Sequence, residues 1–347
     1  MASGVQYRNA ERSDAAALAT LERACFDYDA LSQRNFTWML TKGNAHLLVA
    51  EENGQLLAYA LVLYKRATSL ARLYSIAVLP SAQGRGIARE LMTRVETEAR
   101  ERDCIYMRLE VRPDNAPAIA LYHKLGYYHF GLKHEYYDDS SDALCLEKVL
   151  SHGEEAVRLP VPHYAQTTTF TCGPACLLMA LHALDNSIPL TQRLELQLWR
   201  EATTIFMTAG HGGCGPHGLA LAAHRRGFHV EMYVNQQRPL FVEGVRAADK
   251  KEIIRRVEED FTEQLQQTDV VIDSRPPDVD ELVDALRAGR LPVVLVSSFQ
   301  LTRMKAPHWV ILTGFDDDYI YFHDPEVDAE NHETAAHNAY VPMRKDD

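Results

Sequence analysis

This chain of 347 residues lacks several features that define whole classes of protein. No apolar run approaches the roughly 18 residues that a membrane-spanning helix requires. The N-terminal stretch "MASGVQYRNAERSDAAAL" does not show the basic and then apolar pattern of an export signal. Six scattered cysteines are too few to form a disulfide framework. We therefore expect a cytoplasmic protein with reduced thiols and no membrane partner.

Excess positive charge is also missing. The chain carries 36 basic and 48 acidic side chains, a net charge of −12, which argues against binding to nucleic acid. Residues 1–150 hold 18 basic and 19 acidic side chains, and the remainder holds 18 and 29. A near-neutral half joined to an acidic half predicts two domains in a chain of this length. The acidity fits a basic peptide substrate, although solubility explains it more simply.

The first 150 residues alternate between strand and helix patterns. "VQYRNA" predicts a strand, and Ser13 is expected to cap the helix "DAAALATLERACF". Asn53-Gly54 predicts a hairpin between two strands. Further on, the apolar strand "LARLYSIAVLP" precedes a helix with apolar residues at i, i+4 and i+8. The strand "CIYMRLEV", the helix "NAPAIALYHKL" and two closing strands complete this half.

A polar segment without periodicity, "SHGEEAVRLP", predicts a linker over residues 151–160. Helices are expected near 172–185, 191–201, 216–227, 249–267 and 278–289, followed by the strands "LPVVLVSS", "HWVILTGF" and "YIYFHDP". Helices first and antiparallel strands later predict an α+β domain over residues 161–347.

A glycine-rich turn joins a strand to a helix in "VLPSAQGRGIARELM". Glycines let the backbone approach a ligand closely, and free N–H groups at a helix N-terminus bind a pyrophosphate. The turn is not a Rossmann fingerprint, because antiparallel strands precede it, and it has no Gly-Lys-Ser/Thr of a Walker loop. Tight packing would also explain the glycines. The turn consists of Gln83, Gly84, Arg85, Gly86, Ile87 and Ala88.

Together with "LEVRPDNAPAIALYHKLGY", residues 109–127, this turn resembles the GNAT acetyltransferase family. The segment is similar to the branch that acetylates the N-terminal alanine of a ribosomal protein. The resemblance covers nearly all of residues 4–149. It implies an α/β fold with a mixed, largely antiparallel sheet flanked by helices, and acetyl-CoA as co-substrate. Gln83, Gly86 and Ala88 fill the family's Q/R-x-x-G-x-G/A turn.

The resemblance also implies roles for single residues. The CoA-binding set is Ile76, Ala77 and Val78 for the pantetheine arm, the turn 83–88 for the pyrophosphate, and Asn115. Glu110 would accept the amine proton and Tyr122 would reprotonate the leaving thiolate. Both are needed, because an ammonium cannot attack and a CoA thiolate leaves better when protonated. A solvated glutamate and a core tyrosine are the structural alternatives.

A second candidate site lies in "TFTCGPACLLMALHAL", where Cys172 opens a helix and Cys176 sits further along. Backbone N–H groups and the helix dipole favour a thiolate at a helix start. A cysteine nucleophile needs a histidine base, a group that orients it and an oxyanion donor. Gln166, six residues before Cys172, can supply the donor. A hairpin of the last two predicted strands would bring His308 beside Asp324.

This Q-x5-CGPA … HWVILTGF … HDP arrangement resembles the papain-like fold of bacteriocin-processing cysteine peptidases over roughly residues 160–325. The resemblance implies Cys172 as nucleophile, His308 as base, Asp324 as its orienting group and Gln166 in the oxyanion hole. Those peptidases usually precede membrane spans and an exporter, which this chain lacks, and the segment after the nucleophile helix differs. A buried thiol and a satisfied strand histidine are the alternatives.

No metal is expected. His211, Cys214 and His217 stand at three-residue spacing, but no CxxC or carboxylate cluster completes a four-ligand zinc site. We expect a bifunctional enzyme, an N-acetyltransferase acting on a peptide or protein amine fused to a cysteine peptidase or amide hydrolase. The alternatives are a CoA-binding sensor that regulates the peptidase, an acyl or peptidyl transferase, and a peptide-binding module that does not cleave. The oligomeric state stays open.

Overall fold

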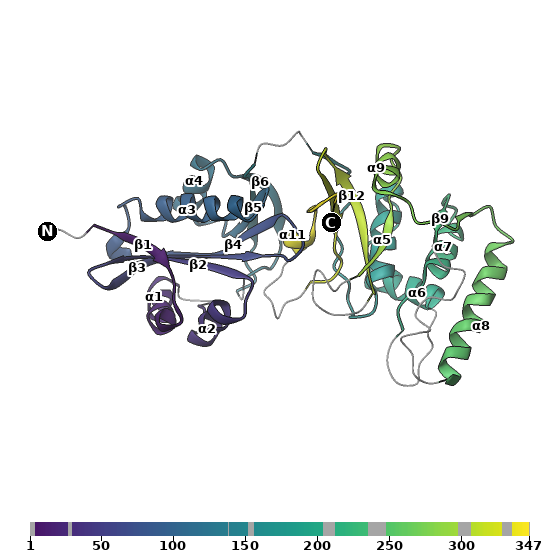
Figure 1. Cartoon of the computed structure of the whole chain (residues 1–347), viewed down its shortest axis with the longest axis horizontal. Helices are drawn as coiled ribbons and strands as arrows, with labels where there is room; N and C mark the ends of the chain where they lie inside the picture. The colour runs from purple at the N-terminus through teal and green to yellow at the C-terminus, as the bar shows by residue number, and fades with distance from the viewer. Residues whose placement is uncertain are drawn as a thin grey trace. The chain divides into compact units, whose positions relative to one another are not determined.

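A computed structural model describes residues 4–26, 30–137, 139–151, 156–203, 212–234, 248–297, 307–327 and 335–346. The chain divides into two compact units, Met1–Gly153 and Glu154–Asp347, and each is described here by itself (Figure 1). In the described ranges, no helix combines the length and the apolar character that crossing a membrane would need.

The first unit is built on a seven-stranded sheet in the order β1-β2-β3-β4-β5-β7-β6. Neighbouring strands are antiparallel except β4 and β5, which run parallel, so the predicted mixed, largely antiparallel sheet is confirmed. The strands are β1 (Gln6–Asn9), β2 (Ala45–Glu52), β3 (Gln55–Tyr64), β4 (Leu70–Val78), β5 (Tyr106–Val111), β6 (Tyr128–Lys133) and β7 (Ala143–Val149). The helices are α1 (Ala15–Cys25), α2 (Gln33–Thr41), α3 (Ile87–Glu101) and α4 (Ala116–Lys124), with short 3-10 helices η1 (Arg12–Asp14) and η2 (Pro80–Ala82).

The sheet of the first unit is covered on both faces. On one face, α3 and α4 pack a buried apolar layer that includes Leu73, Leu91 and Leu109. On the other face, α1 and α2 pack against residues such as Leu61 and Val49. Successive side chains of a strand point to opposite faces, which is why these strands read as almost continuous apolar runs.

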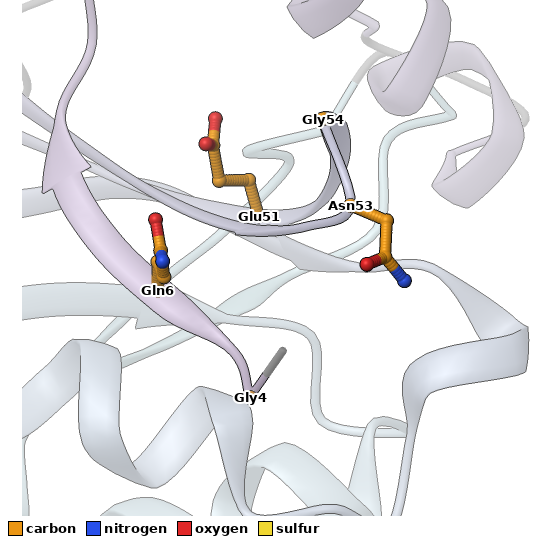
Figure 2. A pocket seen from close by; sticks show the side chains of 5 residues that line it. All are labelled: Gly4, Gln6, Glu51, Asn53 and Gly54. Atoms are coloured by element: carbon orange, nitrogen blue, oxygen red, sulfur yellow. The ribbon is translucent and has the colours of Figure 1, made fainter. Parts of the chain in front are cut away.

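The β2–β3 hairpin turns at Asn53 and Gly54, whose φ angles are both positive (53° and 78°), as the Asn-Gly signal predicts. A small surface pocket lies beside this turn and is lined by Gly4, Gln6, Glu51, Asn53 and Gly54 (Figure 2). It contains none of the predicted site residues, and we assign it no role in catalysis.

The prediction that Ser13 caps the first helix is wrong. Ser13 lies inside η1, and Asp14 occupies the cap position of α1. The reason is a capping box in which Glu11 and Asp14 each accept a hydrogen bond from the other's backbone, so helical structure begins before Ser13.

The second unit contains a five-stranded antiparallel sheet, β11-β12-β13-β14 with β8 paired to β12, and a parallel pair of β9 and β10. Its helices are α5 (Cys172–Leu184), α6 (Gln192–Ala202), α7 (Pro216–His224), α8 (Ala248–Leu265), α9 (Val279–Arg287) and α11 (Ala335–Asn338). Its strands are β8 (Val157–Arg158), β9 (Glu231–Tyr233), β10 (Val271–Asp273), β11 (Val293–Ser297), β12 (Pro307–Phe315), β13 (Tyr319–His323) and β14 (Val341–Arg344). The five predicted helices and the three predicted strands are all present.

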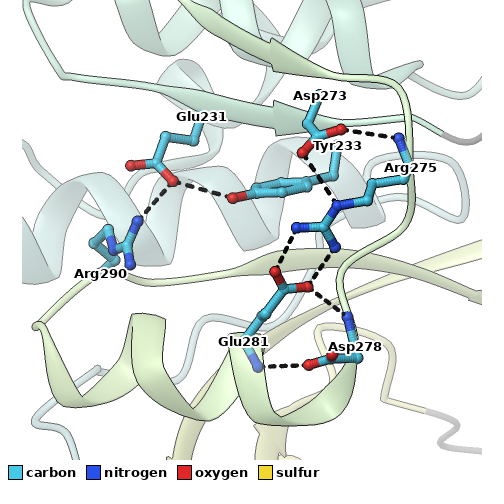
Figure 3. A network of polar contacts seen from close by, with 7 residues as sticks. All are labelled: Glu231, Tyr233, Asp273, Arg275, Asp278, Glu281 and Arg290. Carbon is cyan, nitrogen blue, oxygen red and sulfur yellow. Dashed lines mark hydrogen bonds and ion pairs between the residues drawn. The ribbon is translucent and has the colours of Figure 1, made fainter.

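A surface network of polar contacts links the β9–β10 pair to the start of α9 (Figure 3). Arg275 donates to Glu281 at 2.7 and 2.5 Å, and Glu281 also forms a capping box with Asp278. Arg290 donates to Glu231 at 2.6 Å. Exposed ion pairs of this kind each add little stability. We infer that the network mainly orders the start of α9, where Asp278 and Glu281 form the capping box.

Candidate active sites

The two parallel strands of the first unit separate part-way along their length. They pair from Leu70 opposite Tyr106 to Leu73 opposite Leu109, although both strands continue beyond this point. A β-bulge at Tyr74, an extra residue of β4 relative to β3, lies where the pairing ends. A bulge bends the strand that carries it, which accounts for the separation.

The end of β4 holds Ile76, Ala77 and Val78, for which the resemblance to the GNAT family implies contact with the pantetheine arm. One edge of these residues pairs with β3, where Ala60 faces Ile76 and Ala58 faces Val78. Their other edge pairs with no strand in the part of the chain that the structure describes. Backbone groups on that edge can therefore bond a ligand lying between β4 and β5.

The glycine turn that follows β4 has the conformation of an anion-binding loop. Gly84 and Gly86 have φ angles of 77° and 78°, and an added Cβ at either would meet no atom within 4 Å. Backbone conformation rather than tight packing therefore explains the glycines. Glu90 donates the first helical hydrogen bond of α3 to Gly86, so the N–H groups of residues 87–89 have no helical acceptor.

The side chains of this turn are mostly turned to solvent. Arg85 donates to Glu52 of β2 at 3.1 and 2.8 Å, and Gln83 donates to the Val78 carbonyl at 3.3 Å. Gln83, Gly84, Arg85 and Gly86 are exposed, Ala88 is half-buried, and Ile87 belongs to the core. The backbone of the turn is thus presented outward while Ile87 fixes the helix start.

Glu110 is not a solvated strand-end glutamate. It is the first residue of β5 beyond the stretch paired with β4, and its side chain is only 4% exposed. The Arg72 guanidinium donates to its carboxylate at 2.8 Å and to the Tyr136 hydroxyl at 2.8 Å. The structure therefore holds this carboxylate in a buried ion pair beside the separated strands.

Tyr122 of α4 is buried, and its ring meets that of Tyr127 edge-on at a centroid distance of 5.7 Å. Burial raises the pKa of Tyr122 well above its ordinary value, so the phenol stays protonated. Tyr122 therefore packs in the core and also keeps the proton that a proton donor must carry. Asn115 caps α4, because its side-chain oxygen accepts from Ala118 N–H at 3.2 Å, a contact that the sequence did not indicate.

Cys172 opens α5 in the second unit. The first helical hydrogen bond of α5 runs from Ala175 to Thr171, so the Cys172 N–H has no helical acceptor. An added Cβ on Gly173 would lie 3.0 Å from the Trp309 ring, so glycine is what lets α5 pack closely on β12. This close packing brings the helix start to the strand that begins beside His308.

His308 and Asp324 are brought together by the β12–β13 hairpin. Ile311 pairs with His323 across it, and His308 Nε2 lies 2.7 Å from Asp324 Oδ1. Both side chains are buried, 7% and 6% exposed. Burial alone lowers the pKa of His308, but hydrogen bonds and charge interactions with Asp324 and Cys172 outweigh it and raise the pKa to about 10. The imidazole therefore bonds the carboxylate through Nε2, and Cys172 lies close enough to influence its pKa.

Gln166 is anchored beside this group. Its N–H donates to the Pro325 carbonyl at 2.8 Å, one residue after Asp324. Its side-chain oxygen is buried and has no hydrogen-bond partner among the described residues. All four residues predicted for the second site thus come from separate elements and are linked through His308 and residues 324–325.

Three polar residues at these sites were missed. Arg72 holds Glu110, Glu326 Oε2 lies 3.8 Å from His308 Nδ1, and the fully buried Glu195 accepts hydrogen bonds from the segment before Cys172. The sequence carried a signal only for Glu195, an acidic residue at the buried positions of α6, with Leu198 and Ala202 three and seven residues later.

Among the described residues, no three or more His, Cys, Asp or Glu side chains gather to hold an ion. His211 lies outside the described residues. Burial raises the pKa of the Cys214 thiol, and His217 pairs with Glu258 of α8 at 2.7 Å.

Both units of the chain are similar to known protein families. Residues 161–347, more than half of the chain, match the model of the Peptidase_C39 like family, and residues 15–127 match that of the Acetyltransferase (GNAT) family. A relative from Mycobacterium tuberculosis, the N-alpha-acetyltransferase RimI, is 35% identical over 129 residues, which are 36% of this chain and 80% of the relative. The chain belongs to both families.

The GNAT unit has further relatives. The [ribosomal protein bS18]-alanine N-acetyltransferase of Escherichia coli K12 is 35% identical over 103 residues, 29% of this chain and 68% of the relative. The crystal structure of the Escherichia coli ribosomal-protein-S18-alanine N-acetyltransferase is 27% identical with a TM-score of 0.40, covering 44% of this chain and 97% of that one. A putative acetyltransferase from Salmonella typhimurium, solved with its cofactor acetyl-CoA, is 23% identical with a TM-score of 0.39, covering 44% and 96%. These relatives show that the chain contains an N-acetyltransferase unit, and GNAT acetyltransferases use acetyl-CoA.

Proposed function

We propose that the chain is a bifunctional enzyme that joins an acetyl-CoA-dependent N-acetyltransferase for a peptide or protein amine to a papain-like cysteine peptidase or amide hydrolase. Two relatives of the GNAT unit are named a [ribosomal protein bS18]-alanine N-acetyltransferase and an N-alpha-acetyltransferase, which supports an N-terminal amine as acceptor. The presence of both units in one chain supports a shared peptide substrate.

The separated strands β4 and β5, beside the glycine turn, carry the proposal for acetyl transfer. Backbone groups of Ile76, Ala77 and Val78 would bind the pantetheine arm, and the free N–H groups at the start of α3 would bind the pyrophosphate. Acetyl-CoA supplies an acetyl group activated as a thioester. These contacts would orient the thioester toward the buried end of β5.

Glu110 and Tyr122 would then move the two protons of the reaction. Glu110 would take the proton of the amine whose nitrogen bonds the acetyl carbon. Tyr122, kept protonated by burial, would give its proton to the sulfur as the carbon–sulfur bond breaks. Arg72 would hold the Glu110 carboxylate in place through the ion pair of 2.8 Å.

Mass spectrometry of a peptide with N-terminal alanine, incubated with acetyl-CoA and the full chain, tests this half. One added acetyl group is expected with the wild type and none with Glu110→Gln. A wild type that binds CoA without transferring acetyl would overturn the proposal and favour a CoA-binding sensor.

The bond of His308 to Asp324, with Cys172 near enough to raise the pKa of the imidazole, carries the proposal for the second unit. Cys172 sulfur would attack a carbonyl carbon while His308 holds the proton that the thiol gave up. The Cys172 N–H and the Gln166 amide would bind the oxyanion. Asp324 would keep the imidazole oriented through its bond of 2.7 Å.

Cleavage would proceed through a thioester. As the carbon–nitrogen bond breaks, His308 would give its proton to the leaving amine. A water molecule, deprotonated by His308, would then attack the thioester and release Cys172. If a second amine replaced the water, the same site would act as an acyl transferase.

The rate at which iodoacetamide alkylates Cys172 tests the second half. We expect the wild type to react at pH 6, where a free thiol is largely protonated, and His308→Ala to react at least tenfold more slowly at that pH. Cys176 serves as an internal control, because burial raises the pKa of its thiol. Equal rates for the wild type and His308→Ala would contradict a cysteine–histidine pair.

A further inference from the structure

A buried carboxylate on α6 collects hydrogen bonds from the segment that precedes Cys172. Glu195 is fully buried. It accepts from the Tyr164 hydroxyl at 3.0 Å, from the Thr167 N–H and hydroxyl at 2.9 and 2.6 Å, and from the Thr171 hydroxyl at 2.5 Å. Four donors from a stretch of eight residues thus converge on one side chain.

Burying this carboxylate costs free energy, and so does removing it once its hydrogen bonds have formed. A carboxylate taken out of water is tolerated only when hydrogen bonds replace its hydration, and bonds to an ionised group are stronger than neutral ones. Here both carboxylate oxygens are satisfied by the same segment, Oε1 by the Thr167 N–H and Thr171 and Oε2 by the Tyr164 and Thr167 hydroxyls. Loss of Glu195 would leave these donors without their shared acceptor, and the segment would rearrange to satisfy them.

Both proposed oxyanion donors lie on this segment or at its end. Gln166 directly precedes Thr167, and Cys172 directly follows Thr171, so each donor is the chain neighbour of one of the two bonded threonines. The imidazole is held differently, by Asp324 and the β12–β13 hairpin. A disturbance at Glu195 therefore acts directly on the donors and reaches the base only indirectly, for example through the bond from the Gln166 N–H to the Pro325 carbonyl.

We propose that Glu195 is a positioning residue for the oxyanion hole, which makes the Gln166 amide and the Cys172 N–H converge on one point. The inference rests on the proposed cysteine hydrolase. Glu195 touches no substrate and acts through the segment it binds. The bond between His308 and Asp324 forms without it.

Two probes of the full chain separate these roles. Iodoacetamide alkylates the Cys172 thiolate by displacement of iodide, which creates no oxyanion. Acetyl-diglycine aldehyde adds reversibly, forming a carbon–sulfur bond while its carbonyl oxygen becomes the oxyanion, and its lack of side chains avoids unknown specificity. Protection of Cys172 from iodoacetamide measures the affinity of the aldehyde.

For Glu195→Gln we expect the aldehyde to bind at least tenfold more weakly, since loss of one oxyanion donor costs about 10²-fold or more in such sites. Its alkylation rate should stay within about twofold of the wild type at every pH, as the separate support of the imidazole requires. Thr167→Val removes one hydroxyl from an exposed residue and should weaken the aldehyde in the same direction. Glu201→Gln, on the same helix but paired with Arg226 at 2.7 Å, is the matched control and should change neither readout.

Unchanged aldehyde affinity in both Glu195→Gln and Thr167→Val would overturn the inference, and so would a parallel loss of alkylation, which marks a merely structural residue. The proposed function fails separately, when the wild type itself shows no protection by the aldehyde and no dependence of alkylation on His308.

Discussion

His308 lies in surroundings that strongly favour its protonated form. Burial opposes the charge, yet Asp324 and Cys172 raise the pKa from 6.5 to about 10. A folded-state pKa above the ordinary value means that the folded protein binds this proton more tightly than the unfolded chain. The resulting stabilisation is complete below pH 6.5 and is lost as the pH rises through about 10. In the proposed hydrolase, the same proton would pass to the leaving amine.

The Asp324 carboxylate is therefore expected to set the titration of His308. In Asp324→Asn the charge disappears while burial remains, so the pKa should fall by more than one unit from about 10. Ring ¹⁵N chemical shifts of His308 between pH 5 and 11 measure it directly. The exposed His134, which pairs with Asp142 at 3.1 Å, is an internal reference whose ¹⁵N shifts should be the same in the wild type and the variant at each pH. An unshifted His308 would refute the assigned electrostatic role.

Tyr122 offers a matched test in the GNAT unit. Tyr122→Phe keeps the ring that packs against Tyr127 and removes only the proton donor. We expect kcat for acetyl transfer to fall by about 10²-fold or more, with CoA affinity and stability nearly unchanged. Steady-state kinetics and calorimetric titration with CoA give the two readouts. Full activity of the variant would assign Tyr122 to the core alone.

At the scale of elements, the glycine turn before α3 couples backbone conformation to ligand binding. Gly86 has a φ of 78° with open space around it, so Gly86→Ala meets no clash but forces a left-handed alanine. Such a conformation costs about 1–2 kcal/mol. For Gly86→Ala we expect the free energy of unfolding to fall by about 1–2 kcal/mol and CoA to bind more weakly. Denaturant titration and calorimetry check both, with Gly131→Ala as control because Gly131 also has open space but no positive φ. Unchanged CoA affinity in Gly86→Ala would separate this turn from the phosphate site.

Features that follow from a local rule or from a hairpin were predictable from the sequence, whereas very short strands and contacts set by the register of distant strands were not. The Asn53-Gly54 hairpin and the helix opened by Cys172 follow from local rules, and the His308–Asp324 contact follows from strand pairing. The three-residue strands β9 and β10 are too short to show alternation. The Arg72–Glu110 ion pair depends on the register between two strands, which no local pattern encodes.

At the scale of the whole molecule, each unit has an apolar core of its own. Leu91 is fully buried in a cluster drawn from residues 48–150, and Leu178 is fully buried in one drawn from residues 161–311. A unit with a separate core of this size can unfold cooperatively as one body. We therefore expect two unfolding transitions in calorimetry.

Substitutions in each core, and a ligand of one unit, assign the two transitions. Leu91→Ala should lower the free energy of unfolding of the GNAT unit only, and Leu178→Ala that of the C39-like unit only. Each loss should be about 2–5 kcal/mol, because each substitution leaves a cavity in one core. CoA at about 100 times its dissociation constant should raise the free energy of unfolding of the GNAT unit by about 2.7 kcal/mol, since it binds that folded unit alone. A single transition that responds to both substitutions and to CoA would instead mean that the two units unfold as one. In that case binding of CoA would stabilise the cysteine site as well, which is the coupling that a sensor requires.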